Sequence, residues 1–272
     1  MRILLTNDDG IHAPGIIAMH DALRSLGEVM VVAPLTVQSA TGHGITFREP
    51  LMVRDVAVNE RMSGIAVDGR PADCVKLAIS HLWPKKFGAG SRPDLVVSGM
   101  NLGANVGINV LYSGTVAAAL EAAFLGVPSI ATSLHIGPAN LGPTRYDVAA
   151  AHARTVIDRL LAGWKPPSLP SFGTCVSINV PITAGEQSAS KPTPPIRVCP
   201  MNTHGMIDAF TQHENPMGDT YFWSAGTPLA FHATEPGSDV QSLFEGCITV
   251  TPLKHDLTDA GMMATTSRAI QT

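Results

Sequence analysis

Short apolar runs alternate with segments of helical periodicity along the first part of this chain. Ile3–Leu5 is an apolar run bounded by a polar turn, as expected of a strand that is buried on both faces. Pro14–Leu26 carries apolar residues at helical spacing, and Val29–Ala33 is a second apolar run. A complete β-α-β unit of this length predicts two parallel strands with a right-handed crossover.

The same alternation continues further along the chain. Further helices are predicted at Pro71–Leu82, Thr115–Leu125 and Val148–Leu161, and further strands at Asp94–Ser98, Ser129–Ser133, Cys175–Val180 and Ile248–Thr251. Ser113 is the expected N-cap of the alanine-rich helix and Gly126 its stop. The pattern predicts an α/β fold with a doubly wound, mostly parallel, Rossmann-like sheet, and such sheets bind ligands at the carboxyl ends of their strands.

The texture changes near Trp164, where a proline-rich linker begins. Ile182–Pro195 is rich in Ser, Pro and Ala and is expected to form an exposed loop. Arg197–Phe231 has strand-like pieces between Gly and Pro and is expected to form a hairpin or a projecting arm. We therefore predict a Rossmann-like core at 1–181, a loop and projecting arm at 182–232, and a C-terminal segment at 233–272 that returns to the core.

Two adjacent carboxylates follow the first predicted strand. Asp8 and Asp9 repel each other unless a cation or hydrogen-bond donors compensate, and a carboxylate pair suits a hard divalent cation such as Mg²⁺, Mn²⁺ or Ca²⁺. A single Asp at this place is commonly only a helix cap. The pair favours a metal role for at least one of the two.

A glycine-rich loop follows the second strand. Ser39 can offer its hydroxyl to a metal, and Gly42 lets backbone N–H groups approach a ligand. His43 can donate to a phosphate oxygen or act as an acid. The alternatives are a plain surface turn and a solvated histidine.

Two asparagines lie among glycines after the strand Asp94–Ser98. Asn101 supplies a carbonyl oxygen that suits a hard cation, and Asn105 can donate to an anion. The alternative is that both only occupy turn positions with positive φ, which Asn tolerates.

The start of the alanine-rich helix is a candidate phosphate site. A helix N-terminus offers unpaired N–H groups, and Ser113 and Thr115 add hydroxyl donors on either side of Gly114. Ser113 can serve as the N-cap at the same time.

Composition and charge indicate which classes of partner and which cellular location to expect. The formal net charge of −4 and the absence of a polybasic run argue against binding a nucleic-acid polymer. The four cysteines have no CxxC spacing, so reduced thiols in the cytoplasm are expected. We expect no signal peptide and no membrane span.

Several blocks of the sequence resemble the SurE family of survival-protein nucleotidases. They are Met1–Gly15, Ala33–Thr46, Gly69–Val75, Pro93–Gly107, Tyr112–Ala119 and Thr249–Thr258. The resemblance implies a metal-dependent phosphatase that acts on nucleoside 5′- or 3′-monophosphates and sometimes on short polyphosphate. It also implies an arm that exchanges between subunits in a homodimer or homotetramer.

The resemblance also assigns roles to residues. It places the metal ligands at Asp8, Asp9, Ser39 and Asn101, and the phosphate-binding groups at Asn105, Ser113, Gly114 and Thr115. The chain departs from the family pattern at Arg70, at Ile108–Leu111 and over Leu134–Tyr146. These departures bear on substrate preference.

Hydrolysis of the monoester then follows from in-line attack by a water that is either metal-bound or positioned by Asp8 or Asp9. The helix N-terminus and Ser113 hold the phosphate oxygens, and Asn101 takes part in catalysis through the metal. Attack by an aspartate is the rival route. Other readings of the site are a phosphatase for a specialised phosphoester and a non-catalytic nucleotide- or metal-binding module. A dinucleotide-dependent oxidoreductase is disfavoured, because the first turn lacks GxGxxG.

Overall fold

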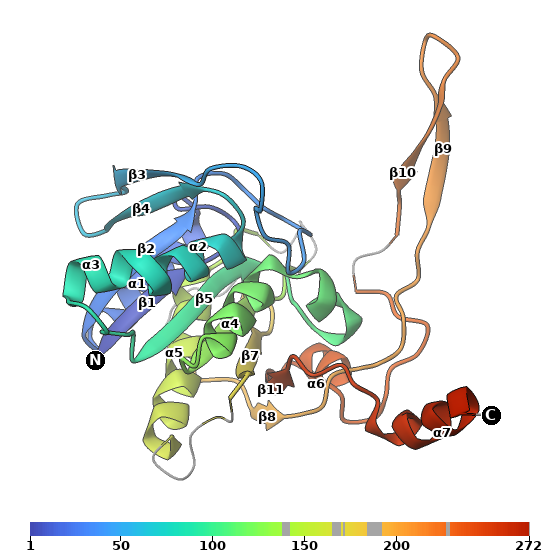
Figure 1. The fold of residues 1–272 in the computed structure, drawn as a ribbon. Coiled ribbons are helices and arrows are strands. Elements are labelled where there is room, and N and C mark those ends of the chain that lie inside the picture. The colour runs from blue at the N-terminus through green and yellow to red at the C-terminus, as the bar shows by residue number, and fades with distance from the viewer. Residues whose placement is uncertain (138–141, 165–169, 171, 184–191, 227–228, 272) are drawn as a thin grey trace.

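The computed structural model describes residues 1–272 except 138–141, 165–169, 171, 184–191, 227–228 and 272 (Figure 1). Its main element is a nine-stranded sheet in the order β3-β4-β2-β1-β5-β6-β7-β11-β8. The strands are β1 (Arg2–Thr6), β2 (Glu28–Pro34), β3 (Met52–Ala57), β4 (Ser63–Asp68), β5 (Leu95–Leu102), β6 (Ser129–Leu134), β7 (Thr174–Val180), β8 (Ile196–Val198) and β11 (Ile248–Lys254).

The centre of the sheet is parallel. β1 pairs with β2 on one side and with β5 on the other, and β5, β6 and β7 continue the parallel run. β11 is antiparallel to β7, and β3 is antiparallel to β4. The predicted α/β fold with a mostly parallel, doubly wound sheet is confirmed.

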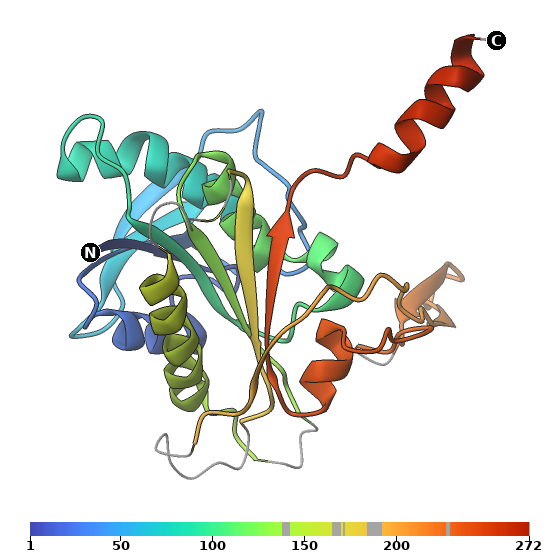
Figure 2. The same cartoon turned by 90° about the horizontal axis from the view of Figure 1, so that it is seen from below.

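Helices cover both faces of the sheet. The helices of the described residues are α1 (Pro14–Leu23), α2 (Pro71–Leu77), α3 (Trp83–Phe87), α4 (Gly114–Phe124), α5 (Tyr146–Gly163), α6 (Asp239–Phe244) and α7 (Ala260–Gln271), with a π-helical turn at Ala78–Leu82 and a 3₁₀ helix at Gly107–Tyr112. α1 and α5 pack together on one face, and α2 and α4 pack together on the other (Figure 2).

Each face of the sheet has its own apolar core. The first core contains the inward residues of α1 and α5, such as Ile16 and Ile157, against Leu5 and Val97 of the sheet. The second contains residues of α2 and α4 against the opposite face of the same strands. Because β1 and β5 are buried on both faces, their sequences are nearly continuous apolar runs.

Two elements differ from the sequence prediction. The helix predicted at Pro71–Leu82 is α-helical only to Leu77, and a π-helical turn then leads into α3. No element was predicted for residues 47–68, where β3 and β4 form a hairpin at the edge of the sheet.

The predicted hairpin is present and projects from the sheet (Figure 1). It consists of β9 (Phe210–Glu214) and β10 (Thr220–Ser224), which pair antiparallel. β8 lies in the main sheet, so the segment predicted as loop and arm also contributes a strand to the core. At the C-terminus β11 lies in the sheet, whereas no residue of α7 is buried. The domain boundaries at residues 181 and 232 stay a prediction.

Candidate active site

The order of the sheet reverses between β1 and β5, and this reversal places a crevice at their carboxyl ends. Asp8 and Asp9 follow β1, and Asn101 lies near the end of β5. β5 is bulged between Ser98 and Asn101, so its register against β6 shifts at this point. Bulges of this kind re-aim side chains beside functional sites. The topology therefore brings the predicted oxygen ligands to one end of two adjacent strands.

Asp8 is buried against the start of α4. Its Oδ1 accepts a hydrogen bond of 2.5 Å from the Thr115 hydroxyl. A Cβ atom at Gly114 would lie 2.9 Å from the Cβ of Asp8, so only glycine permits this approach without a shift. Gly114 and Thr115 thus support Asp8, and neither is among the described residues that line the cavity beside it.

The two carboxylates lie in a poorly solvated place. Burial raises the pKa of Asp8 to about 6, and the neighbouring charge of Asp9 raises it as well, whereas the Thr115 hydroxyl lowers it. Burial also raises the pKa of Asp9, whose Oδ2 accepts a hydrogen bond of 3.0 Å from the Leu102 N–H. The backbone of Asp8 and of Thr115 also hydrogen-bonds to the Asp8 carboxylate and lowers its pKa, so the donors to both carboxylates are neutral groups.

Ser113 caps α4, as the sequence predicts. Its hydroxyl oxygen accepts a hydrogen bond of 3.1 Å from the N–H of Val116. The positive end of the helix dipole therefore faces the carboxyl ends of the strands, where an anion is favoured.

The two asparagines are both nearly buried. The side-chain amide of Asn101 donates to the Gly103 carbonyl at 2.7 Å, which leaves its Oδ1 without a donor among the described residues. The amide of Asn105 donates to the hydroxyl of Ser133 at 2.9 Å. Neither asparagine has the positive φ that the alternative role in a turn requires.

The glycine-rich loop separates its predicted residues. Ser39 lines the cavity, whereas the Gly42 N–H donates to the Tyr112 carbonyl at 3.0 Å. His43 lies instead against α4, with its Nε2 2.9 Å from Oε2 of Glu121 and its ring stacked on Phe124. Glu121 is buried, which raises its pKa, but the contacts from His43 and Lys76 lower it overall. His43 is not among the described residues that line the cavity.

The cavity has a volume of about 650 Å³. Five predicted site residues line it, and they are Asp8, Ser39, Asn101, Asn105 and Ser113. This volume lies within the range of small-molecule sites in proteins.

A further wall of the cavity contains residues to which the sequence analysis gave no individual role, although it linked the stretch Leu134–Tyr146 to substrate preference. His135 and the arm residues Met206, Ile207 and Asp208 contribute to this wall. Burial lowers the pKa of His135, which favours its neutral form, and its ring lies edge-on against Phe244. The sequence offered one signal for His135, because it is a titratable residue just after the strand predicted at Ser129–Ser133. The arm residues gave no such signal, and only the fold places them at the cavity.

The charge of the cavity is negative. Asp8 and Asp208 line it, and the described lining residues include neither Lys nor Arg. The described part of the chain also contains no group of three or more His, Cys, Asp or Glu side chains that could hold a metal. The predicted metal ligands are the carboxylates of Asp8 and Asp9, the amide oxygen of Asn101 and the hydroxyl of Ser39. All are oxygen atoms, which suit a hard cation better than a soft one.

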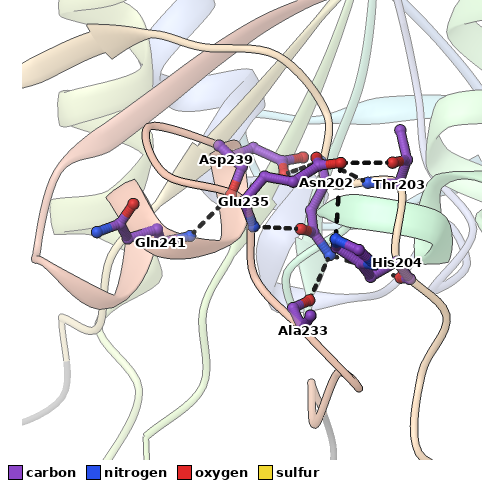
Figure 3. Close-up of polar contacts among 8 residues, drawn as sticks. Asn202, Thr203, His204, Ala233, Glu235, Asp239 and Gln241 are labelled. Atoms are coloured by element: carbon purple, nitrogen blue, oxygen red, sulfur yellow. Dashed lines mark hydrogen bonds and ion pairs between the residues drawn. The ribbon is translucent and has the colours of Figure 1, made fainter.

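Asn202 and Asp239 are the buried centre of a polar network at the root of the arm (Figure 3). Asp239 accepts three hydrogen bonds of 2.8 Å from the backbone N–H groups of Gly107, Asn202 and Val240. Gly107 begins the 3₁₀ helix whose Asn109 and Tyr112 line the cavity. One carboxylate thus fixes the cavity wall, the outgoing arm and α6 to one another.

The returning chain of the arm is held by the same network. The Asn202 side chain accepts from the Glu235 N–H at 2.9 Å and donates to the Ala233 carbonyl at 3.3 Å. Glu235 in turn accepts from the hydroxyl of Thr203 at 2.7 Å. The two chains of the arm therefore leave and re-enter the core at a fixed spacing.

Among the helices of the described residues, none has the length and apolar character needed to cross a bilayer.

Comparisons with known proteins identify relatives along the whole chain. The family model described as Survival protein SurE matches residues 3–206. A protein named 5′-nucleotidase SurE from Rhodopirellula baltica is 44% identical over 258 residues, covering 95% of this chain and 94% of that protein. A protein named 5′-nucleotidase SurE 1 from Thermus thermophilus is 42% identical over 276 residues, covering 100% of this chain and 98% of that protein.

A solved structure has the same fold. The crystal structure of the SurE protein from Aquifex aeolicus superposes with a TM-score of 0.79 at 33% sequence identity, covering 99% of this chain and 100% of that chain.

The buried Asp239 carboxylate gives the first testable prediction. Asp239→Asn keeps the size of the side chain but replaces an acceptor oxygen with an NH₂ group that faces N–H donors. We expect the free energy of unfolding to fall by about 1–3 kcal/mol, the cost of leaving a buried polar group unpaired. Denaturant unfolding measures it, with Asp219→Asn at the exposed tip of the arm as the control. Equal stability of the two variants would contradict this role of Asp239.

Proposed function

The chain belongs to the Survival protein SurE family, and we propose that it is a metal-dependent 5′-nucleotidase that hydrolyses nucleoside 5′-monophosphates to nucleoside and phosphate. Relatives of nearly equal length that bear the name 5′-nucleotidase SurE support the reaction. Nucleoside 3′-monophosphates are proposed as a second class of substrate.

One observation carries the metal dependence. A phosphate monoester is a dianion near neutral pH, and the cavity that would receive it presents Asp8 and Asp208 but no Lys or Arg among its described lining residues. Without a cation the site would repel its substrate. Oxygen atoms of Asp8, Asp9, Ser39 and Asn101 suit Mg²⁺, Mn²⁺ or Ca²⁺. When bound, the ion offsets charge on the phosphate in the transition state.

The protein's own groups perform the remaining work. The Ser113 hydroxyl orients the phosphate, the positive end of the α4 dipole favours its charge, and Asn105 donates to another phosphate oxygen. Asp9 or Asp8 accepts a proton from the attacking water, and the raised pKa of Asp8 brings that carboxylate closer to neutral pH as a base. The wall formed by His135 and the arm residues encloses the nucleoside.

Four of the residues predicted to bind phosphate take a different role in this proposal. Thr115 and Gly114 act on Asp8 rather than on phosphate, because the Thr115 hydroxyl is bonded to the carboxylate. His43 and Gly42 hold the loop of Ser39 through their contacts with Glu121 and Tyr112.

A homodimer or homotetramer formed through the arm is proposed as the assembly. The described residues of β9 and β10 are all exposed, and they include Phe210, Phe222 and Trp223. A projecting hairpin with large apolar side chains is typical of an interaction element. A cytoplasmic location also stays a prediction, supported by four buried cysteines that are all free.

The activity is tested with a panel of nucleoside 5′- and 3′-monophosphates assayed with Mg²⁺, with Mn²⁺ and with EDTA. We expect phosphate release that depends on the metal and that EDTA abolishes. Asp8→Asn and Asn101→Ala should lower kcat/KM about 10²–10⁴-fold, as loss of a charge-stabilising or general-base group does. Asp55→Asn on the exposed strand β3 is the control.

The panel also separates the competing functions. Release that survives EDTA would contradict the metal proposal. A folded protein that binds monophosphates but releases no phosphate is instead a binding module. A folded protein that neither binds nor cleaves any of them acts on a different phosphoester.

The bond from Thr115 to Asp8 gives a prediction about metal affinity. Thr115→Val keeps the shape of the side chain but removes the donor that holds Asp8 in place. We expect the dissociation constant for Mn²⁺ to rise about 10–100-fold, as for other groups that orient a metal ligand. Calorimetric titration of Mn²⁺ measures this, and Thr155→Val on α5 is the matched control. An unchanged dissociation constant would contradict the role of Thr115 in positioning Asp8 as a metal ligand.

The arm gives a prediction about assembly. Phe222→Ser combined with Trp223→Ser removes apolar surface that is exposed in the single chain, so the fold of one chain should persist. We expect sedimentation equilibrium to report a lower mass than for the wild type. Phe47→Ser, at an exposed position outside the arm, should leave the mass unchanged. A wild-type protein that sediments as a single chain would rule out the assembly.

A further inference from the structure

Beneath the cavity, three side chains form a row across the parallel strands. Asn101 of β5 pairs in register with Ser133 of β6, and Ser133 pairs in register with Asn179 of β7. Residues paired across a parallel sheet present their side chains on the same face. Asn101 lines the cavity, whereas Ser133 and Asn179 are completely or almost completely buried and are not among its described lining residues.

Asn179 binds the backbone of Asn105 with both ends of its amide. Its Oδ1 accepts a hydrogen bond of 2.8 Å from the Asn105 N–H, and its Nδ2 donates one of 3.1 Å to the Asn105 carbonyl. Asn105 lies between β5 and the 3₁₀ helix, outside any strand or helix. The buried amide of Asn179 therefore provides the hydrogen-bond partners that its backbone N–H and C=O would have in regular secondary structure. The position of the Asn105 backbone is therefore set by a side chain from a distant strand.

Ser133 acts on the side chain of the same residue. Its hydroxyl accepts one N–H of the Asn105 amide at 2.9 Å, which leaves the second N–H of that amide for the cavity. Rotation of the Asn105 amide would break this bond inside a buried region, so the bond selects one orientation.

We propose that Asn179 and Ser133 are positioning residues for phosphate binding, with Asn179 fixing the backbone of Asn105 and Ser133 fixing the direction of its amide. This inference rests on the proposed function, because it takes Asn105 to be a donor to the phosphate. Neither residue touches the substrate. Their effect on phosphate passes through Asn105 alone, and this separates them from residues that only stabilise the core.

The test compares two serines of the same strand. Ser133 and Ser129 are both fully buried in β6, and the hydroxyl of Ser129 donates to the Ala119 carbonyl at 2.6 Å, away from Asn105. We expect Ser133→Ala to raise the dissociation constant for inorganic phosphate about tenfold, the value of one hydrogen bond. Ser129→Ala should leave it unchanged. Calorimetric titration of phosphate in a buffer that contains Mn²⁺ measures this dissociation constant. A separate titration of Mn²⁺ alone should give the same Mn²⁺ affinity for both variants.

A double-mutant cycle decides whether Ser133 acts through Asn105. In the Asn105→Ala background, Ser133→Ala should change the phosphate dissociation constant by less than about twofold, because the amide it orients is gone.

Asn179→Asp tests the backbone contact. The variant keeps the acceptor but loses the donor to the Asn105 carbonyl. If this displaces Asn105 by about 1 Å, kcat/KM should fall about 100-fold.

The possible failures can be told apart. If the wild type hydrolyses monophosphates but Ser133→Ala behaves like Ser129→Ala, or if the cycle is additive, the positioning role is wrong and the proposed function stands. If the wild type neither binds phosphate nor hydrolyses monophosphates, both the proposed function and this inference are wrong. Should Asn179→Asp fail to fold, the serine pair and the cycle still give the answer.

Discussion

The carboxylate of Asp8 is buried beside that of Asp9, and two like charges in such a place repel each other more strongly than they would in water. The structure offsets part of this repulsion with neutral donors, namely the Thr115 hydroxyl and the Leu102 N–H. The N-terminus of α4 adds the positive end of a helix dipole. Because these donors are neutral, they do not cancel the charge of the pair, and a cation would still be favoured beside it. The approach of α4 to β1, which needs glycine at position 114, is what keeps the pair in this state.

That approach is a consequence of the sheet order. β1 lies at the centre, with β2 and β5 on either side, and the crossovers of these strands cover opposite faces. The crevice between β1 and β5 therefore opens where Asp8, Asn101 and the start of α4 meet. The arm completes the crevice from the other side, and Asp239 fixes its root to the 3₁₀ helix that follows Asn105. A site built from distant segments is thus held by two buried side chains, Asp239 and Asn179, which reach backbone groups and leave the cavity itself free.

The sequence was sufficient for the centre of the fold because β1, β2 and β5 are buried on both faces and α4 has a clear cap and stop. β3 could not be predicted in this way, since most of its residues are exposed at an edge and show no apolar alternation. α7 was not predicted either, and its apolar residues Met262, Met263 and Ile270 are exposed and do not pack on the core.

The same distinction holds for the site. Asp8, Asn101 and Ser113 were predicted because they follow strands or open a helix. The direction of Thr115 toward Asp8 and of His43 toward Glu121 depends on how α4 packs, and no local pattern contains that information. The roles of Asp208 and His135 in the wall depend on the path of the arm and of the loop after β6.

The charge of the cavity connects these features with the proposed reaction. A phosphatase that used Arg or Lys to hold phosphate would bind its substrate without any metal, since those charges are permanent. Here the described lining offers carboxylates and neutral donors, so a phosphate dianion and a divalent cation each improve the site for the other. Thermodynamic linkage makes this coupling reciprocal. The neutral donors then have to be placed accurately, because they contribute direction and little charge, and the buried contacts of Asn105 meet that requirement.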